Sequence, residues 1–475
     1  MTNVIIEALT QAAADVGNIE TALEEANAVA VPPTTSVLAP GADEVSAVIT
    51  ALFNGHAQAY QELAAQATGF HRQFTALLAQ AGAAYQNTEQ ASEQLLRDTV
   101  TKVEQPLAPL LPSRNTTPVP PTVPTNSSVG LILGGTDEPF TEALLQQIPS
   151  LYNLPTNSNS LLYTPEQLWP LTPQYGGLTL GQSVAQGVSL LNNAIHTQLG
   201  AGNSVTVWGT SQSSIIITEE IRNLMAAGSP DASKLSFVLT GNPNNPNGGI
   251  LERFTGYYIP GLDILFNGAT PAGSPYVTAI YTNQYDPISD FPQHPLNAIS
   301  DLNAIMGGCV GQHFYQYPLN TYYQLPTSPG YTGNTTYYMR LDQTLPLVQP
   351  LRRLGTTGNA IADLLQPDLR VIVDTGYGSN EYANLPTPAQ LLEIPNIAVI
   401  ANDLATGTVQ GVNAFGVDMG SLPQSDFPNA YPYLPALDPQ LNFTTGQPSI
   451  TGISLLTGAQ HQLMNSLGLI PEWDQ

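Results

Sequence analysis

The stretch Ser204–Ser214, SVTVWGTSQSS, has the residue types needed for nucleophilic chemistry. An alternating apolar run breaks at Gly209, and Ser211 follows two residues later. A serine hydroxyl attacks a carbonyl at neutral pH when a histidine takes its proton and an acid orients that histidine. The order of strand, tight turn and helix predicts a nucleophile elbow at Ser211, with Ser213 where the commonest motif, Gly-x-Ser-x-Gly, has its second glycine. A surface turn with three serines is the alternative.

Candidate acids and bases follow the serine in the order that α/β-hydrolases use. Asp286 ends the strand-like run YVTAIYTNQYD and is favoured as the acid over Asp290, although an aspartate beside proline can also simply cap a turn. His313 follows the glycine-rich segment GGCVGQ, which can return an imidazole to the serine. It is preferred to His461, in an expected C-terminal helix, and to His294, which lies close to the acid in the sequence.

Two N–H donors are needed to hold the oxyanion that forms when a serine attacks an ester. The N–H of Gln212, directly after the serine, is one candidate. The second is expected from the LGGTDEP loop after the first predicted strand, where Gly135 and Thr136 lie. Glycine lets a backbone approach a substrate closely, and the Thr136 hydroxyl is a further donor.

Metal and nucleotide chemistry find no support in the sequence. The chain has one cysteine, Cys309, so an intrachain disulfide and a cysteine metal cluster are both excluded. The glycine-rich segments GGTDEP and GYGS lack phosphate-binding spacing. No metal and no cofactor are therefore predicted, and Cys309 is expected to be a buried thiol.

Composition restricts the partners of this 475-residue chain. It carries 11 Lys and Arg against 36 Asp and Glu, a net charge of −25, so nucleic acid is not an expected partner. No window approaches 18 consecutive apolar residues, and no transmembrane segment is predicted. The N-terminus also lacks the basic start and continuous apolar core of an ordinary secretory signal peptide.

Four regions are expected along the chain. Residues 1–100 repeat apolar side chains at steps of three and four, which predicts an α-helical hairpin interrupted at VPPTTS. A proline-rich linker follows at 101–128. Strands alternate with helices in 129–395, which predicts an α/β domain with a mainly parallel sheet. Residues 396–475 show little periodicity and are expected to pack on that domain as a C-terminal extension.

The segment GADEVSAVITALFNGHAQAYQELAAQATGFHRQFTALLAQAGAAY resembles the N-terminal module of mycobacterial PE proteins, including its ADEVSA motif and the preceding PTT turn. The Pro-Glu pair that names the family is absent, and Glu7 follows Ile6. Tyr85 and Glu89 fit the Tyr-x-x-x-Asp/Glu export signal of type VII secretion substrates. The resemblance implies a PPE protein as a helical partner and secretion through the type VII machinery.

The region from 129 to 379 resembles the PE-PPE domain, a cutinase-like serine α/β-hydrolase. The matching segments, in order, are LGGTDEP, GTSQS, YDPISDFPQHPLN, TTYYMRLDQTLPLVQPLR and LQPDLRVIVDTGYGS. The family motif permits Ser213, and the resemblance implies Ser211 as nucleophile, Asp286 as acid and His313 as base. One departure is Pro287, where the family pattern has glycine.

The resulting hypothesis is a secreted serine acyl hydrolase, an esterase or lipase, that acts on acyl esters or glycolipids of the mycobacterial cell envelope. A transacylase that moves acyl chains between glycolipids such as acylated trehaloses is the first alternative. A non-catalytic surface protein is the second. Seven tyrosines between Tyr315 and Tyr338 fit either an interface with amphiphiles or ordinary packing.

Overall fold

The computed structural model describes residues 128–137, 142–154, 158–378, 382–391, 393–442 and 450–470, with scattered residues between 21 and 68. The chain divides into two compact units, Met1–Leu111 and Pro112–Gln475. The predicted hairpin of residues 1–100 is described only in part. Tyr85, Glu89 and the predicted linker, apart from Ser128, lie outside the described residues.

In the N-terminal unit, residues 27–35 are helical, and so are the described residues between 50 and 68. The helix break expected across VPPTTS is wrong, because the helix continues to Thr35. The hydroxyls of Thr34 and Thr35 donate to the carbonyls four residues earlier and add hydrogen bonds to this last turn. The Asn54 side chain then exchanges two hydrogen bonds with the backbone of Val37, which joins the end of the first helical segment to the second.

The second unit contains a seven-stranded sheet in the order β2-β1-β3-β4-β7-β9-β8. Every pairing is parallel except that of β8 with β9. Its strands are β1 Val129–Leu133, β2 Asn159–Leu161, β3 Val205–Thr210, β4 Leu235–Thr240, β7 Val277–Asn283, β8 Tyr322–Gln324 and β9 Thr335–Arg340. A separate antiparallel pair consists of β5 Tyr258–Ile259 and β6 Ile264–Leu265. The predicted α/β fold class with a mainly parallel sheet is confirmed.

Helices connect and cover these strands. They are α3 Glu142–Leu151, α4 Leu180–Gly200, α5 Gln212–Ala226, α6 Ile250–Arg253, α7 Ala298–Val310, α8 Gln349–Arg352, α9 Thr356–Asp374, α10 Ile397–Asp418 and α11 Gly452–Ser466. Short 3₁₀ turns lie at Leu319–Thr321, Pro346–Val348 and Gln424–Asp426. None of the helices in the described part of the chain is both long and apolar enough to cross a membrane.

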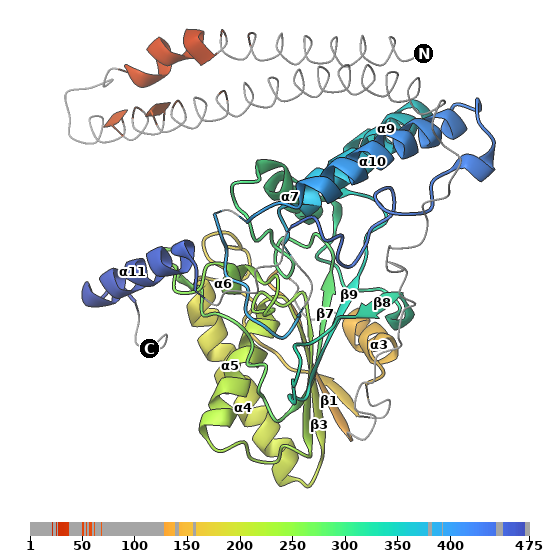
Figure 1. Cartoon of the computed structure of the whole chain (residues 1–475). Coiled ribbons are helices and arrows are strands. Elements are labelled where there is room, and N and C mark those ends of the chain that lie inside the picture. Colours follow the sequence, from red (N-terminus) through yellow and green to blue (C-terminus); the bar gives the residue numbers. More distant parts are fainter. Residues whose placement is uncertain are drawn as a thin grey trace. The chain divides into compact units, whose positions relative to one another are not determined.

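The sheet is buried on both faces, as Figure 1 shows, with α4 and α5 on one side and α3 on the other. Along β3, Val205 and Val207 pack with Ile216 and other residues of α4 and α5, while Trp208 packs with Tyr152 beyond α3. A strand covered on both faces needs apolar residues at consecutive positions. This explains why the strands are continuous apolar runs in the sequence.

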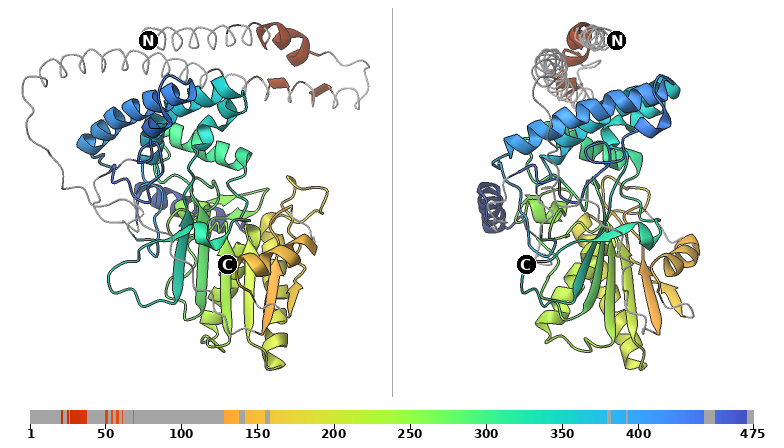
Figure 2. Two further views of the ribbon diagram at one scale, coloured as in Figure 1. Left: turned by 90° about the vertical axis from the view of Figure 1, so that its right-hand side faces the viewer. Right: turned by 45° about the vertical axis from the view of Figure 1, so that its right-hand side comes forward.

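Parallel pairing brings the carboxyl ends of β3, β4 and β7 to one edge of the sheet. Thr210 is level with Thr240, and Thr240 with Tyr281. The residues that follow these strands therefore share that edge, where open α/β sheets bind ligands. Helices α9 and α10 lie side by side beyond this end of the sheet in both views of Figure 2.

The region after residue 396, for which the sequence predicts only a C-terminal helix around His461, contains two long helices. Helix α10 lies so close to α9 that a Cβ on Gly411 would be 2.2 Å from the Leu364 carbonyl oxygen. Helix α11 is held by Thr457, which donates to the Thr255 carbonyl, and by a two-way hydrogen bond between Gln460 and the backbone of Tyr258.

One side-chain expectation is wrong, and one open alternative is decided. Cys309 is exposed near the end of α7, because α7 buries the side that carries Ser300, Asn303, Ala304 and Gly307, and Cys309 is not on it. The tyrosines between 315 and 338 do not form an exposed cluster. Four of them, Tyr315, Tyr322, Tyr337 and Tyr338, are buried, which favours ordinary packing; the last three lie on β8 and β9 of the covered sheet.

Candidate active site

Ser211 occupies the single residue between β3 and α5, on a sharp turn. Its backbone has φ 53° and ψ −117°, and its N–H donates to the carbonyl of Thr240 over 3.0 Å. A serine with positive φ is strained, and such strain persists where the surrounding structure holds it. This is the strand–turn–helix geometry of a nucleophile elbow.

The close approach of β3 and α5 explains why the residues two before and two after Ser211 are small. A Cβ on Gly209 would lie 2.6 Å from Ile217 Cδ1 and 3.1 Å from both Ser213 Cβ and the Ser213 carbonyl oxygen. Strand and helix therefore meet too closely for a side chain at Gly209. Ser213 is fully buried yet is accommodated, so serine fits at the second small position of this elbow.

Asp286 and His313 are in direct contact. The Nδ1 atom of His313 lies 2.9 Å from each of the two carboxylate oxygens of Asp286. The carboxylate is completely buried, whereas the imidazole is about a quarter exposed, at 26%. A carboxylate can only accept here, so the proton of the neutral imidazole is on Nδ1, and Nε2 keeps the lone pair of a base.

Three further donors hold the Asp286 carboxylate. Tyr315 donates to Oδ2 over 2.5 Å, Ser289 donates to Oδ2 over 2.7 Å, and the N–H of Ile288 donates to Oδ1 over 2.9 Å. Burial by itself raises the pKa of Asp286. The attraction of His313 and the hydrogen bonds from His313, Tyr315 and Ile288 outweigh burial, and the pKa is lowered. Asp286 is therefore a carboxylate at neutral pH.

Asp290, the alternative acid, lies in the same loop but serves another group. Its Oδ2 accepts the N–H of Tyr285, a residue with φ 66°, over 2.8 Å. Burial raises its pKa to about 7 against the opposing effects of that hydrogen bond and of Arg253. Asp290 thus supports the turn that presents Asp286.

The alternative histidines lie elsewhere. His294 pairs with Glu393 over 2.9 Å, and both side chains are nearly buried. His461 lies on α11, as the sequence predicts. Among these three histidines, His313 is the one that hydrogen-bonds to Asp286 in the described structure, which leaves it as the candidate base.

Gly241 brings His313 to the end of the sheet that carries Ser211. Gly241 follows β4 with φ +55°, and a Cβ on it would lie 2.7 Å from His313 Cε1. The preceding residue, Thr240, supplies the carbonyl that accepts the Ser211 N–H. The imidazole and the serine therefore flank the same two-residue segment.

Asn283 fixes the loop that carries His313, because its Nδ2 donates to the carbonyls of Gln312 and Phe314, on either side of His313.

The three candidate oxyanion residues also come together beside Ser211. A Cβ on Gly135 would lie 3.2 Å from Ser211 Cβ. The Gln212 side chain donates from Nε2 to Thr136 Oγ1 over 3.1 Å, which links the elbow to the loop after β1. Its Oε1 accepts the Ser183 hydroxyl over 2.9 Å. The Gln212 side chain is thereby fixed, and Gln212 is the first residue of α5.

Several residues of the site have no signal in the sequence. Tyr315 and Ser289 hold the Asp286 carboxylate, and Glu166 accepts the Gly134 N–H over 3.1 Å at the start of the loop after β1. Glu166 is buried and has φ 53°.

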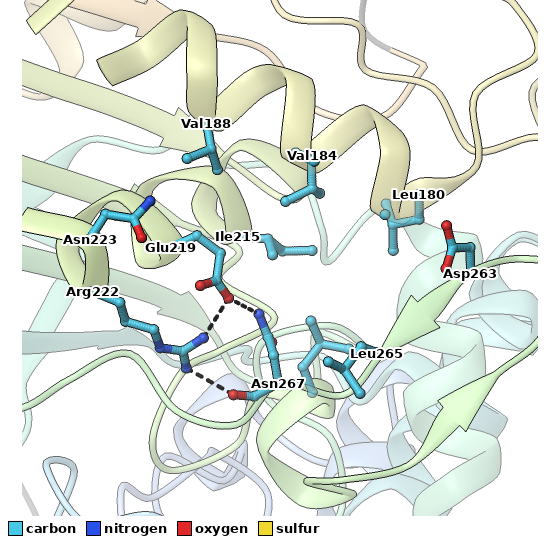
Figure 3. A pocket seen from close by; sticks show the side chains of 13 residues that line it. Leu180, Val184, Val188, Ile215, Glu219, Arg222, Asn223, Asp263, Leu265 and Asn267 are labelled. Carbon is cyan, nitrogen blue, oxygen red and sulfur yellow. Dashed lines mark hydrogen bonds and ion pairs between the residues drawn. The ribbon is translucent and has the colours of Figure 1, made fainter. Parts of the chain in front are cut away.

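A cavity of about 440 Å³ lies between α4, α5 and β6, as Figure 3 shows. Its walls combine apolar side chains, among them Leu180, Val184 and Ile215, with polar ones such as Asp263. At one end Arg222 pairs with Glu219 over 2.5 Å and donates to the Asn267 carbonyl, so these polar groups satisfy one another. Ser211, Asp286 and His313 do not line this cavity. Within the described residues, no group of three or more His, Cys, Asp or Glu side chains is arranged to hold a metal ion.

Comparison with known proteins gives the family. Residues 3–92 match the model of the PE family, and residues 155–378 match that of the PE-PPE domain. PE family protein PE3 of Mycobacterium tuberculosis is 48% identical, over 95% of this chain and 96% of its own. This chain belongs to the PE family. The predicted resemblance is confirmed, although the Pro-Glu pair is missing from this PE protein.

Two further relatives of this PE protein, both from Mycobacterium tuberculosis, carry names of enzymes. Esterase PE16 is 41% identical, over 82% of this chain and 71% of its own. SL1278 acyltransferase Chp1 is 32% identical, over 50% of this chain and 58% of its own. Both names refer to acyl-group chemistry.

Two solved structures are similar over part of the chain. A cutinase-like protein from Cryptococcus sp. shares 19% identity with a TM-score of 0.24, over 34% of this chain and 78% of its own. The catalytic core domain of acetyl xylan esterase from Trichoderma reesei shares 16% identity with a TM-score of 0.26, over 39% of this chain and 96% of its own.

Proposed function

We propose that this PE protein is a serine acyl hydrolase, an esterase or lipase, that forms an acyl-enzyme on Ser211. The observation that carries the proposal is the contact of His313 Nδ1 with both oxygens of Asp286 while the imidazole lies against Gly241, beside the carbonyl that holds Ser211. The 41% identity to Esterase PE16 supports the same chemistry.

In the first half-reaction, Ser211 Oγ attacks the ester carbonyl carbon while its proton passes to His313 Nε2. The imidazolium is stabilised by the Asp286 carboxylate, which stays ionised because its pKa is lowered. The tetrahedral intermediate collapses when His313 returns that proton to the leaving alcohol oxygen. An acyl-Ser211 ester and a free alcohol result.

The backbone N–H of Gln212 and the N–H groups of Gly135 and Thr136 are the proposed donors to the oxyanion. Donors that are fixed before the reaction stabilise developing charge without reorganisation. The hydrogen bond from Gln212 to Thr136 and that from Gly134 to Glu166 supply such rigidity. In the second half-reaction, His313 takes a proton from water, whose oxygen attacks the acyl carbonyl carbon. His313 then returns the proton to Ser211 Oγ as the bond between Ser211 Oγ and the acyl carbon breaks, and a carboxylic acid leaves.

The experiment that tests this proposal is labelling of the full chain with a fluorophosphonate, together with hydrolysis of a short p-nitrophenyl ester. We expect Ser211→Ala to abolish both labelling and turnover. Ser213→Ala, a neighbouring serine on the same elbow, is the matched control and should keep both. Labelling that persists in the Ser211→Ala variant would contradict the assignment.

A transacylase is the second candidate, because a sugar hydroxyl can replace water in the second half-reaction. The similarity to SL1278 acyltransferase Chp1 favours it. Incubation with an acylated trehalose distinguishes the two reactions. A more acylated trehalose among the products would support transfer, whereas free fatty acid alone would support hydrolysis. A non-catalytic surface protein remains the alternative from another class, and an unlabelled, inactive wild-type chain would support it.

We also propose a location, a partner and a domain organisation. Membership of the PE family supports secretion through the type VII machinery to the cell envelope, with Tyr85 and Glu89 as the export signal and a PPE protein bound to the helices of residues 1–100. Residues 129–395 would form the catalytic domain and 396–475 its extension. Loss of the protein from culture filtrate and cell surface in a Tyr85→Ala variant, with normal intracellular amounts, is the expected result.

A further inference from the structure

Large apolar side chains are exposed around the candidate active site. They are Tyr163 (69% exposed), Trp169 (44%), Leu171 (64%), Tyr175 (37%) and Phe314 (66%), which we call the apolar rim. Exposed leucine, tryptophan and phenylalanine side chains lose apolar hydration when they are covered, so a cluster of them indicates an interaction surface.

Four of these side chains belong to the loop of residues 163–178, which is attached to the oxyanion side of the site. The carbonyl of Gln167 accepts Gln212 Nε2 over 2.9 Å, and the Gln167 N–H donates to Ser183 Oγ over 3.1 Å. At the tip, Gln174 donates to Asp137 over 3.1 Å. Asp137 directly follows Thr136, so the tip of this loop borders the proposed oxyanion donors.

Phe314 lies in a different loop of the site, directly after His313. Its carbonyl accepts Asn283 Nδ2 over 3.0 Å, which fixes the backbone, while the ring remains exposed. The apolar rim therefore includes residues next to the oxyanion loop and next to the proposed base.

The chemistry of the rim favours a lipid surface without charge. Tyrosine and tryptophan combine an apolar ring with a polar atom, and they are enriched where proteins meet the headgroup region of a bilayer. Glu166 is the one charged residue in 158–178, and it is buried. No Lys or Arg is present there or in 311–318 to bind an anionic headgroup, and the chain carries a net charge of −25.

We propose that the apolar rim docks on an uncharged or zwitterionic lipid surface and holds Ser211 against it. The natural substrate would then be an acyl ester within a lipid aggregate. This inference rests on the proposed function for the identity of the ester, but the docking itself does not require catalysis.

Flotation of the full-length chain with phosphatidylcholine vesicles tests the docking in a Ser211→Ala background, where catalysis plays no part. We expect binding in that background, and at least about tenfold weaker binding when Trp169→Ser and Leu171→Ser are added, because burial of apolar side chains determines interfacial affinity. Leu354→Ser removes an equally exposed leucine (73%) from the turn between α8 and α9 and should bind like its parent.

Equal binding of the rim variant and the Leu354 control would overturn the inference. So would binding confined to anionic phosphatidylglycerol vesicles. A rim-dependent dimer that forms without lipid would also overturn it, because the rim would then bind a second copy of the chain.

Tryptophan fluorescence and kinetics supply a second readout. Of the three tryptophans, Trp169 is exposed and Trp208 is buried. Vesicles should shift the emission of Trp169 to shorter wavelength, and the shift should disappear in Trp169→Phe. With active enzyme, Leu171→Ser should leave hydrolysis of a soluble short ester unchanged and reduce hydrolysis of a vesicle-bound long-chain ester several-fold. An equal loss on both substrates would contradict docking through the rim.

Discussion

Tyr315 donates a hydrogen bond to Asp286 Oδ2 over 2.5 Å, from a position two residues after the histidine that the same carboxylate holds. The phenol also accepts the N–H of Asn283 over 3.0 Å, at the end of β7. One buried tyrosine thus joins the strand end, the acid and the histidine loop. The geometry between Asp286 and His313 depends on this side chain as well as on the two residues themselves.

Tyr315→Phe is expected to lower kcat/KM by about tenfold or more, because a hydrogen bond to a charged group contributes about 1.5–3 kcal/mol. Removal of this donor also raises the pKa of Asp286 from its lowered value. The loss of activity on the acid side should therefore begin at a higher pH. Initial rates of ester hydrolysis from pH 4 to 8 measure both effects.

The matched control is Tyr276→Phe. Tyr276 directly precedes β7, and its buried hydroxyl donates to the Pro230 carbonyl. The substitution should reduce stability by about 1 kcal/mol and leave the pH profile unchanged. If both variants had the same pH profile as the wild type, Tyr315 would have only a structural role.

Replacement by asparagine should lower kcat strongly at Asp286 and hardly at all at Asp290. Asp286→Asn removes the charge that holds His313, and a comparable change in a serine triad lowers kcat about 10⁴-fold. Asp290→Asn keeps an oxygen for the Tyr285 N–H, and its carboxyl already has a pKa of about 7. We expect its kcat to stay within about threefold of wild type.

Steady-state kinetics of the two variants at pH 7.5 make the comparison, with circular dichroism to show that both are folded. The reverse order of losses would indicate Asp290 as the acid and would require the loop to rearrange in solution.

Much of the fold follows from the sequence because the sheet is covered on both faces. Strands such as 129–133 and 235–240 must then be continuous apolar runs, and they are visible as such. Helix α10 escaped prediction for a related reason. The side it buries consists of small residues such as Gly407, Gly411 and Ala414, so no stripe of large apolar residues marks it.

The candidate site could be predicted only as far as chain order and local turns allow. Ser211 is identifiable because its strand, turn and helix are contiguous. The sequence favours Asp286 as the acid but does not exclude Asp290. The two differ in how the backbone turn at Tyr285, which has a positive φ, orients them, and a sequence does not reveal that turn. Tyr315 and Glu166 act across the fold, and a sequence does not state which distant residues a buried carboxylate or loop will meet.

Buried carboxyl groups should make the chain more stable in mild acid than in mild alkali. Burial raises the pKa values of Glu220, Glu252 and Asp290 to about 7, and that of Asp374 to about 6. In the unfolded chain such groups ionise near pH 4, so the folded state binds more protons between about pH 4 and pH 7. Stability is therefore expected to fall as pH rises through this window.

Melting temperatures at pH 5, 6, 7 and 8 in one ionic strength measure this effect. Glu220→Gln removes one of these titrations and keeps the oxygen that accepts Asn192 over 2.9 Å. Its melting temperature should change less with pH than that of the wild type. A wild-type melting temperature that increased from pH 5 to pH 8 would show that these carboxyl groups ionise without penalty in the folded protein.

Gly209 and Ser213 are expected to differ sharply in their tolerance of substitution, although both occupy small-residue positions of the elbow. Gly209→Ala places a Cβ 2.6 Å from Ile217 Cδ1 and 3.1 Å from the Ser213 carbonyl oxygen. Such overpacking typically costs about 1–3 kcal/mol. It should also displace Ser211 and reduce turnover.

Ser213→Ala removes a fully buried hydroxyl that has no hydrogen-bond partner in the described structure, so stability should be unchanged or higher. Urea unfolding of both variants, with equal m values as the control for a common unfolded state, tests the pair. Wild-type stability and activity in Gly209→Ala would mean that strand and helix are farther apart than the elbow requires.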